Sequence, residues 1–195
     1  KDIKMNKKNY EFQAEVGKIL NIVANSLYSD KEIFLREYIS NASDACDKLR
    51  YEQLKNPKLI EKGEKFQIVV TTDKKKNLIE ISDNGIGMNK EELISSLGTI
   101  AKSGTEEFIK KMESEKNNDI EQIGKFGVGF YSGFMVAKKI SVVSKKPNSK
   151  ESWIWESDGK GTFDITEADK KERGTIVQVY LNDANKDFSE KIRVE

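Results

Sequence analysis

Four polar side chains recur at helical spacing between residues 30 and 54. Residues three or four apart lie on one face of an α-helix, so these four predict a single polar stripe, made of Glu37, Asn41, Asp44 and Lys48. The functional interpretation is that a carboxylate, an amide and a second carboxylate converge on one cleft. The competing interpretation is the shoulder of a solvated face, on which Asp44 and Lys48 form an ordinary i,i+4 ion pair.

A second acidic group stands at the end of a short predicted strand. The alternating apolar pattern of residues 78–82 stops at Asp83, and Gly85 and Gly87 follow it. A carboxylate there could accept a hydrogen bond from a ligand, and the glycines allow a close approach where a Cβ atom would collide. Taken alone, the segment is also typical of a strand that leaves through an Asp-Asn-Gly turn.

Glycine-rich and polar segments follow between residues 98 and 130. The segment 124–130, GKFGVGF, precedes a predicted helix over 131–137, and free amides at a helix N-terminus attract anions. Its spacing matches neither a Walker loop nor a dinucleotide fingerprint. Residues 98–126 contain few apolar residues beyond a charged helix near 106–113, which predicts a mobile lid or, alternatively, a surface insertion.

Composition excludes several other kinds of site. Lys and Arg total 34 against 33 Asp and Glu, so charge gives no reason to expect nucleic acid or a membrane surface as a partner. The absence of histidine removes Ser-His-Asp and Cys-His nucleophilic sites and histidine-ligated zinc. The single cysteine, Cys46, cannot form an internal disulfide and fits a reducing compartment.

The elements that must position these groups follow from apolar periodicity. A strand at 10–13 and a helix over 14–27 come first, and the capping pattern Ser29-Asp30-Lys31-Glu32 predicts a long helix from about Asp30 to Leu54. Later elements are a hairpin of 66–72 and 78–82, a short helix from 89, and strands at 140–144, 151–156, 161–165 and 175–181. We therefore expect an α+β two-layer sandwich with helices on one face of a largely antiparallel, mixed sheet.

These segments together resemble the N-terminal nucleotide-binding domain of the heat-shock protein 90 chaperones, within the Bergerat-fold ATPases that include gyrase, histidine kinases and the MutL repair proteins. The resemblance covers residues 12–195 and rests on FQAE at 12–15, SLYSDKEIFLRE at 26–37, ISNASDA at 39–45, DNGIGM at 83–88, LGTIAKSGT at 97–105 and GVGFYS at 127–132. KERGTI at 171–176 is most like the bacterial high-temperature protein G branch. The resemblance implies the Bergerat ATP-binding fold.

The resemblance also implies roles for single residues. Asp83 would receive the adenine amino group, helped by Thr175 through water, and Gly87 and Met88 would line the base pocket. Glu37 would be the catalytic base that activates water. Asn41 would be the Mg²⁺ ligand. The other residues expected to bind ATP or ADP are Asp44, Lys48, Ser96, Lys102, Gly127, Val128, Gly129 and Phe130.

Two positions depart from the family pattern. Ser96 stands where the family usually has Asn, which puts a hydrogen bond to the ribose side in doubt, and Lys125 stands where Gln is usual and adds charge beside the phosphates. No residue resembles the activating arginine that the family's middle domain supplies. Because such an arginine is worth about 10³ to 10⁵ in rate, we expect ATP binding with slow hydrolysis.

The expected function is therefore an Mg²⁺-dependent ATPase domain of a cytoplasmic molecular chaperone, rather than a mitochondrial one. Residues 1–195 would form a single N-terminal domain of a longer protein, with an ATP lid at 98–126 whose closure favours homodimerisation. Its partners would be client proteins and the middle and C-terminal domains of its own chain, with no nucleic acid and no membrane. The alternative is a nucleotide-sensing module, like those of gyrase, MutL or the kinases, whose bound ATP sets conformation without significant turnover.

Overall fold

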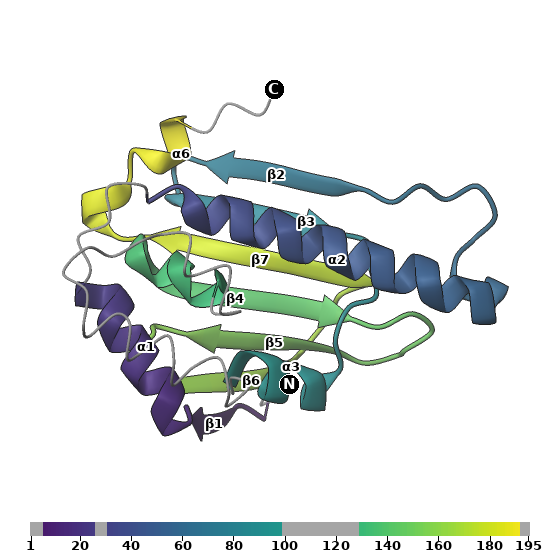
Figure 1. The fold of residues 1–195 in the computed structure, drawn as a ribbon, viewed down its shortest axis with the longest axis horizontal. Helices are drawn as coiled ribbons and strands as arrows, with labels where there is room; N and C mark the ends of the chain where they lie inside the picture. The colour runs from purple at the N-terminus through teal and green to yellow at the C-terminus, as the bar shows by residue number, and fades with distance from the viewer. Residues whose placement is uncertain (1–5, 26–30, 99–128, 192–195) are drawn as a thin grey trace, which may run out of the picture.

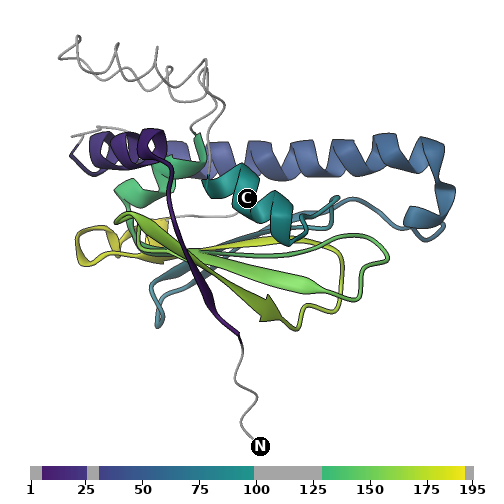
Figure 2. The same ribbon diagram turned by 90° about the horizontal axis from the view of Figure 1, so that it is seen from below.

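A computed structural model describes residues 6–25, 31–98 and 129–191, and it shows a layer of helices on one face of a seven-stranded sheet (Figure 1). The strand order is β1-β6-β5-β4-β7-β3-β2, and every neighbouring pair is antiparallel. Figure 2 shows α1, α2 and α3 on the same side of this sheet. The predicted α+β sandwich is confirmed, although the described strands form no parallel pair and the sheet is not mixed.

The strands follow from alternating apolar residues. Ile79 and Ile81 are almost fully buried beneath the helices, and Asp83 is the next residue on that face. The boundaries differ from the predicted ones by a few residues. They are β1 Lys8–Glu11, β2 Ile68–Asp73, β3 Leu78–Asp83, β4 Ala137–Lys145, β5 Ser152–Ser157, β6 Thr162–Ala168 and β7 Gly174–Leu181.

The described residues form four α-helices, of which α1, α2 and α3 lie over the sheet (Figure 2). The α-helices are α1 Ala14–Asn25, α2 Ile33–Lys55, α3 Lys90–Gly98 and the short α6 Phe188–Lys191. The 3₁₀-helices are η1 Pro57–Leu59, η2 Gly129–Met135 and η3 Asp183–Asn185. No helix among the described residues is long and apolar enough to cross a bilayer.

The long helix α2 begins three residues later than predicted. Lys31 and Glu32 form a turn, in which the Leu35 amide donates to the Glu32 carbonyl at 3.0 Å, and Glu32 makes no side-chain cap. The Lys31 ammonium donates to Asn185 Oδ1 at 3.1 Å, so a tertiary contact ties this turn to η3. The predicted cap, Ser29, lies outside the described residues.

A reciprocal capping box starts α3 instead. The Asn89 amide donates to Glu92 Oε2 and the Glu92 amide donates to Asn89 Oδ1, both at 2.8 Å. This arrangement confirms the predicted helix from residue 89. Of the predicted lid, 98–126, only Gly98, the last residue of α3, is described, and the predicted helix near 106–113 lies outside the described residues.

The helix predicted over 131–137 is wrong. The chain forms the 3₁₀-helix η2 over Gly129–Met135 and enters β4 at Ala137. The Val136 amide donates to the Gly133 carbonyl at 3.2 Å, an i→i+3 bond of the 3₁₀ type, and the Val136 carbonyl accepts from the Asn182 amide at 2.9 Å. The second bond already belongs to the sheet side of the molecule, so an α-helix cannot continue.

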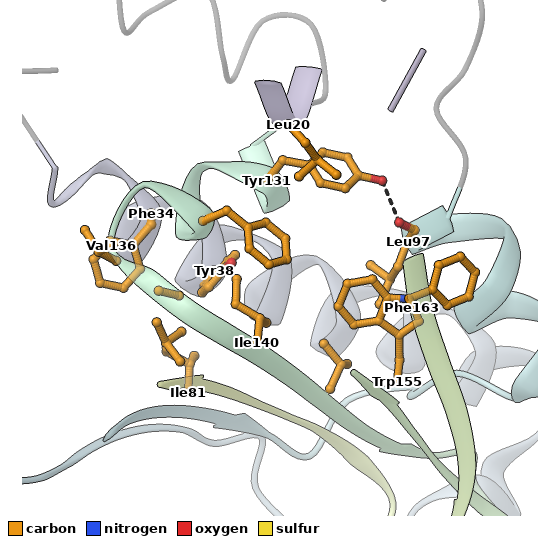
Figure 3. Packing of buried hydrophobic residues seen from close by; sticks show 14 of the residues in the cluster. Leu20, Phe34, Tyr38, Ile81, Leu97, Tyr131, Val136, Ile140, Trp155 and Phe163 are labelled. Atoms are coloured by element: carbon orange, nitrogen blue, oxygen red, sulfur yellow. Dashed lines mark hydrogen bonds between the residues drawn. The ribbon is translucent and has the colours of Figure 1, made fainter. Parts of the chain in front are cut away.

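An aromatic core joins η2 and α3 to the sheet. Trp155 stacks on Phe163 with ring centroids 5.6 Å apart, and Phe130 meets Trp155 edge to face at 5.4 Å. The Tyr131 hydroxyl donates to the Leu97 carbonyl at 2.6 Å, which anchors the last turn of α3 (Figure 3). The core therefore fixes both elements at the edge of the site described next.

Candidate functional site

The glycine turn after β3 lies directly against α2. The Ile86 amide donates to the Ala45 carbonyl at 3.0 Å, and a Cβ atom on Gly85 would lie 2.5 Å from the Ala45 carbonyl carbon. Small residues on both sides permit this approach. The contact brings Asp83, at the end of β3, beside the polar stripe of α2. The contact made by the Ala45 carbonyl joins residues far apart in the chain and could not be read from a local sequence pattern.

Two adjoining cavities open at this junction. The larger has a volume of about 930 Å³ and is lined by the whole stripe, Glu37, Asn41, Asp44 and Lys48. The smaller, about 90 Å³, is lined by Asp83 together with Asn41, and the two cavities share Ala45, Met88, Leu97, Phe130 and Thr175. The stripe is therefore the wall of a cleft. Among the described residues no ion pair joins Asp44 to Lys48, and Asn41, Asp44 and Lys48 are exposed on the open side of this cleft.

Asp83 is a buried carboxylate at the closed end of this site. Its side chain is 8% exposed, and Oδ1 accepts the Gly85 amide at 2.9 Å. Burial raises the pKa of Asp83 to about 6, while the backbone amides of Gly85 and Thr175 and the charge of Lys170 oppose the rise. The carboxylate is mostly ionised at neutral pH and would gain from a further N–H donor.

A hydroxyl network adjoins Asp83. Ser144 Oγ accepts the Met88 amide at 2.8 Å and lies 2.8 Å from Thr175 Oγ1. Ser144 is fully buried. Ser144 was not named from the sequence, although the alternation of the strand places it on the face that contains the core residues. In β4 the positions facing the helices are Ile140, Val142 and then Ser144, so a polar residue occupies a core position.

The opposite end of the cleft pairs Glu37 with the start of η2. A Cβ atom on Gly129 would collide with the Glu37 carboxylate, and the Tyr38 hydroxyl donates to the Phe130 carbonyl at 2.7 Å. Glu37 is half-buried, and burial raises the pKa of its carboxyl group. A carboxylate of raised pKa facing a cleft can accept a proton from water.

The anion site predicted from a helix dipole needs correction. Its helix is the seven-residue 3₁₀-helix η2, whose few peptide groups cannot sum to the macrodipole of a long α-helix. Any anion contact there would rest on the individual amides of Gly129 and Phe130. Three predicted residues, Lys102, Gly127 and Val128, lie outside the described residues, as does Lys125.

The remaining predicted residues line the cleft. Gly87, Met88 and Ser96 all contribute to the wall of the larger cavity. Gly87 has φ of 64°, and a Cβ atom there would collide with the Lys145 carbonyl, so only glycine fits this turn. The rim also carries the Lys146–Glu92 ion pair, at 2.8 Å, which the sequence interpretation missed because the two residues are 54 positions apart.

The donor set in the cleft fits a cation that arrives with its own ligands. The described residues contain no group of three or more Asp, Glu or Cys side chains able to hold a metal alone. Asn41, whose side chain carries a neutral amide oxygen, lines both cavities. Mg²⁺ is commonly bound in this way, through one or two protein oxygens with phosphate and water completing the shell.

Comparison with known proteins agrees with this geometry. Residues 19–186 match the family described as histidine kinase-, DNA gyrase B- and HSP90-like ATPase. The chain is 52% identical over 188 residues to the chaperone protein HtpG of Roseobacter denitrificans, covering 96% of this chain and 30% of that protein. It is 50% identical over 192 residues to HtpG of Rickettsia typhi, covering 98% and 31%. The chain thus spans about 30% of the length of these relatives.

Proposed function

The chain belongs to the family of histidine kinase-, DNA gyrase B- and HSP90-like ATPases, and from this membership we propose that it is the ATP-binding and slowly hydrolysing domain of a molecular chaperone. The chaperone assignment rests on the identity to HtpG proteins across almost the whole chain. It also rests on the chaperone-like segments at 26–45 and 97–105. The domain would be part of a longer, cytoplasmic protein.

The observation that carries the proposal is Asp83 and Asn41 lining one small cavity that opens into a larger one. In our proposal the buried Asp83 carboxylate accepts the adenine amino group. A hydrogen bond to a charged acceptor is worth about 1.5 to 3 kcal/mol, and a purine lacking this donor would leave the acid unsatisfied. The base would be enclosed by Gly87, Met88 and Thr175. The sugar and the opening of the larger cavity would be bordered by Ser96, Asp44 and Lys48.

The phosphates would extend along α2 toward Glu37. Asn41 would contribute its amide oxygen to Mg²⁺, which supplies charge neutralisation when it is bound with the nucleotide. Glu37 would orient the attacking water and take its proton, a role supported by its raised pKa and by its place on the cleft wall. Lys102 and the amides of residues 127–130 would contact phosphate oxygens.

In the whole protein we propose that ATP acts by favouring one conformation. Residues 98–126 would close over the nucleotide, and the closed form would favour pairing of two copies and action on client proteins. The free energy for this change is the difference in ATP affinity between the open and closed states. An arginine from outside this domain would be needed for fast hydrolysis.

The test is calorimetric titration of the 195-residue chain with ATP and ADP, with and without Mg²⁺. We expect saturable 1:1 binding of both nucleotides, tighter with Mg²⁺, and hydrolysis far slower than one turnover per second. A chain that binds neither nucleotide would refute the proposal. Binding with no detectable hydrolysis, even over many hours, would instead favour a nucleotide sensor.

A further inference from the structure

Ser144 occupies a position from which it can control the polarity of the purine site. Its side chain is fully buried at the end of β4, next to β7, where Thr175 begins the strand wall of both cavities. Ser144 Oγ lies 2.8 Å from the Met88 amide nitrogen, 2.8 Å from Thr175 Oγ1 and 3.4 Å from the Gly174 carbonyl oxygen. It therefore joins the glycine turn to the residue beside Asp83.

The number of hydrogens and the distances together bear on the direction of these hydrogen bonds. The Met88 amide can only donate, so Ser144 Oγ must accept from it. Ser144 then has one hydrogen to give, either to Thr175 or to the Gly174 carbonyl. The contact to Thr175 has the usual length of a hydroxyl hydrogen bond, whereas 3.4 Å is longer than that range. Either hydroxyl can donate in the Ser144–Thr175 contact, and the shorter distance favours Ser144 as the donor to Thr175.

This direction leaves the Thr175 hydrogen free. Within the described part of the chain, the Thr175 hydroxyl has no hydrogen-bond partner other than Ser144. Since its oxygen already receives the Ser144 hydrogen, its own hydrogen can turn into the cavity that Thr175 lines with Asp83. The wall then presents a carboxylate acceptor from Asp83 and, on the neighbouring strand position, a hydroxyl donor from Thr175.

We propose that Ser144 is a specificity-determining residue, which acts through Thr175 by fixing that hydroxyl as a donor toward the base. The proposal rests on the nucleotide-binding function proposed above. An acceptor beside a donor matches a 6-aminopurine, whose amino group donates and whose ring N1 accepts. A 6-oxopurine has the opposite pattern, because its oxygen accepts and its N1–H donates. Both direct contacts would then be unfavourable.

The experiment compares ADP with inosine diphosphate, which differs at these two purine positions. In wild type we expect a large ratio of the dissociation constants, inosine diphosphate over ADP. In Ser144→Ala the Thr175 hydroxyl can turn and accept the N1–H, so the ratio should fall about tenfold, the worth of one hydrogen bond of the correct polarity. Ser144→Ala also removes the acceptor of the Met88 amide. Any weakening of nucleotide binding from this loss affects both nucleotides alike and cancels in the ratio.

The matched control is Ser141→Ala. Ser141 is also a buried serine of β4, 2% exposed, but its hydroxyl donates to Glu156 Oε2 at 2.7 Å, on the sheet face away from the cavity. Its ratio should stay within about twofold of wild type, and circular dichroism should show both variants folded. An unchanged ratio in Ser144→Ala, or no measurable inosine diphosphate binding by that variant, overturns the proposal. Failure of wild type to bind ADP would refute the proposed function instead.

Discussion

The Asp83 carboxylate is held where its charge is unfavourable. Its pKa in the folded chain is about 6, against an ordinary value of 3.8. Because folding raises this pKa, the protonated carboxyl group favours the folded chain. This contribution to stability is fully present below pH 4 and is lost as the pH rises through about 6. At neutral pH the ionised group therefore costs the folded chain about 3 kcal/mol. An unfavourable buried charge at a cavity wall is typical of a residue that forms a hydrogen bond with a bound ligand.

Asp83→Asn should separate stability from binding. The neutral amide keeps an oxygen that can accept from the Gly85 amide, but it removes the buried charge. The free energy of unfolding of the ligand-free chain should therefore rise by about 1 to 3 kcal/mol at pH 7. ADP binding should be lost, because the amide is a poorer and partly misdirected acceptor. Urea unfolding and calorimetry measure the two effects. Undiminished ADP affinity would contradict the adenine role, and Asp47→Asn, at an exposed ion pair, serves as the control.

The affinity for ADP should depend on the ionisation of the same group. An amino donor binds the carboxylate form, so affinity should be nearly constant above pH 7 and fall by up to about tenfold per pH unit below about 6. ADP binding near pH 6 should release protons from Asp83, and this release is measurable as a buffer-dependent enthalpy. An affinity that rises on acidification would mean that the ligand binds protonated Asp83.

Glu37→Gln should abolish chemistry and spare binding. Glutamine retains the size of the side chain that packs against Gly129, but it cannot take a proton. ATP hydrolysis should fall by at least about 10², while the ADP dissociation constant stays within about threefold. Radiolabelled ATP hydrolysis over hours provides the sensitivity that a slow enzyme needs. Equal turnover in the variant and wild type would remove Glu37 from the catalytic role.

At the level of elements, the site depends on how closely the turn after β3 approaches α2. The bond from the Ile86 amide to the Ala45 carbonyl spans a gap that only a glycine at position 85 leaves open. Behind the turn, Arg173 donates to the Asn84 carbonyl at 3.0 Å and pairs with Glu64 at 2.9 Å. The turn is thus held from both sides, which keeps Asp83 in register with Asn41.

Gly85→Ala tests this packing. The added methyl group would meet the Ala45 backbone at 2.5 Å, and backbone atoms of a buried helix cannot move aside cheaply. We expect a loss of about 1 to 3 kcal/mol in the free energy of unfolding and a fall in ADP affinity of at least tenfold. Denaturant titration and calorimetry measure both.

Gly17→Ala provides the opposite control. Gly17 lies inside α1 with nothing within 4 Å of the position of a Cβ atom. Alanine there should stabilise the chain by about 0.5 to 1 kcal/mol through helix propensity and leave ADP affinity unchanged. Equal effects of the two glycine substitutions would contradict the packing argument.

At the level of the whole molecule, the cleft lies between the two layers. Its walls come from α2, α3 and η2 in the helical layer, and from Thr175 of β7 with Asp83 of β3 in the sheet. The aromatic core around Trp155 joins the same layers at one edge of the cleft (Figure 3). A ligand in the cleft would therefore contact both layers.

ADP should therefore stabilise the folded chain by simple mass action. At a free concentration of 100 times its dissociation constant, ADP should raise the free energy of unfolding by about 2.7 kcal/mol. Thermal unfolding followed by circular dichroism at several ADP concentrations measures this increase. The increase should disappear in Asp83→Asn, and a similar increase in that variant would indicate binding elsewhere on the chain.

The sequence alone determined which residues share a face. Helical spacing placed Glu37 and Asn41 on one stripe, and strand alternation ended β3 at Asp83, because both periods are set by local backbone geometry. The number of strands and the two-layer arrangement followed from the same local patterns. Family resemblance then assigned an adenine nucleotide to residues that periodicity could only group.

Tertiary structure decided everything that depends on distant neighbours. The turn before α2 contacts η3 through Lys31 and Asn185, and the chain passes from η2 into β4 where the Val136 carbonyl accepts from the Asn182 amide. Ser144 contacts Thr175 only because β4 lies beside β7, and the raised pKa of Asp83 arises from burial. Such contacts join residues far apart in the chain, and no local pattern encodes the distance between them.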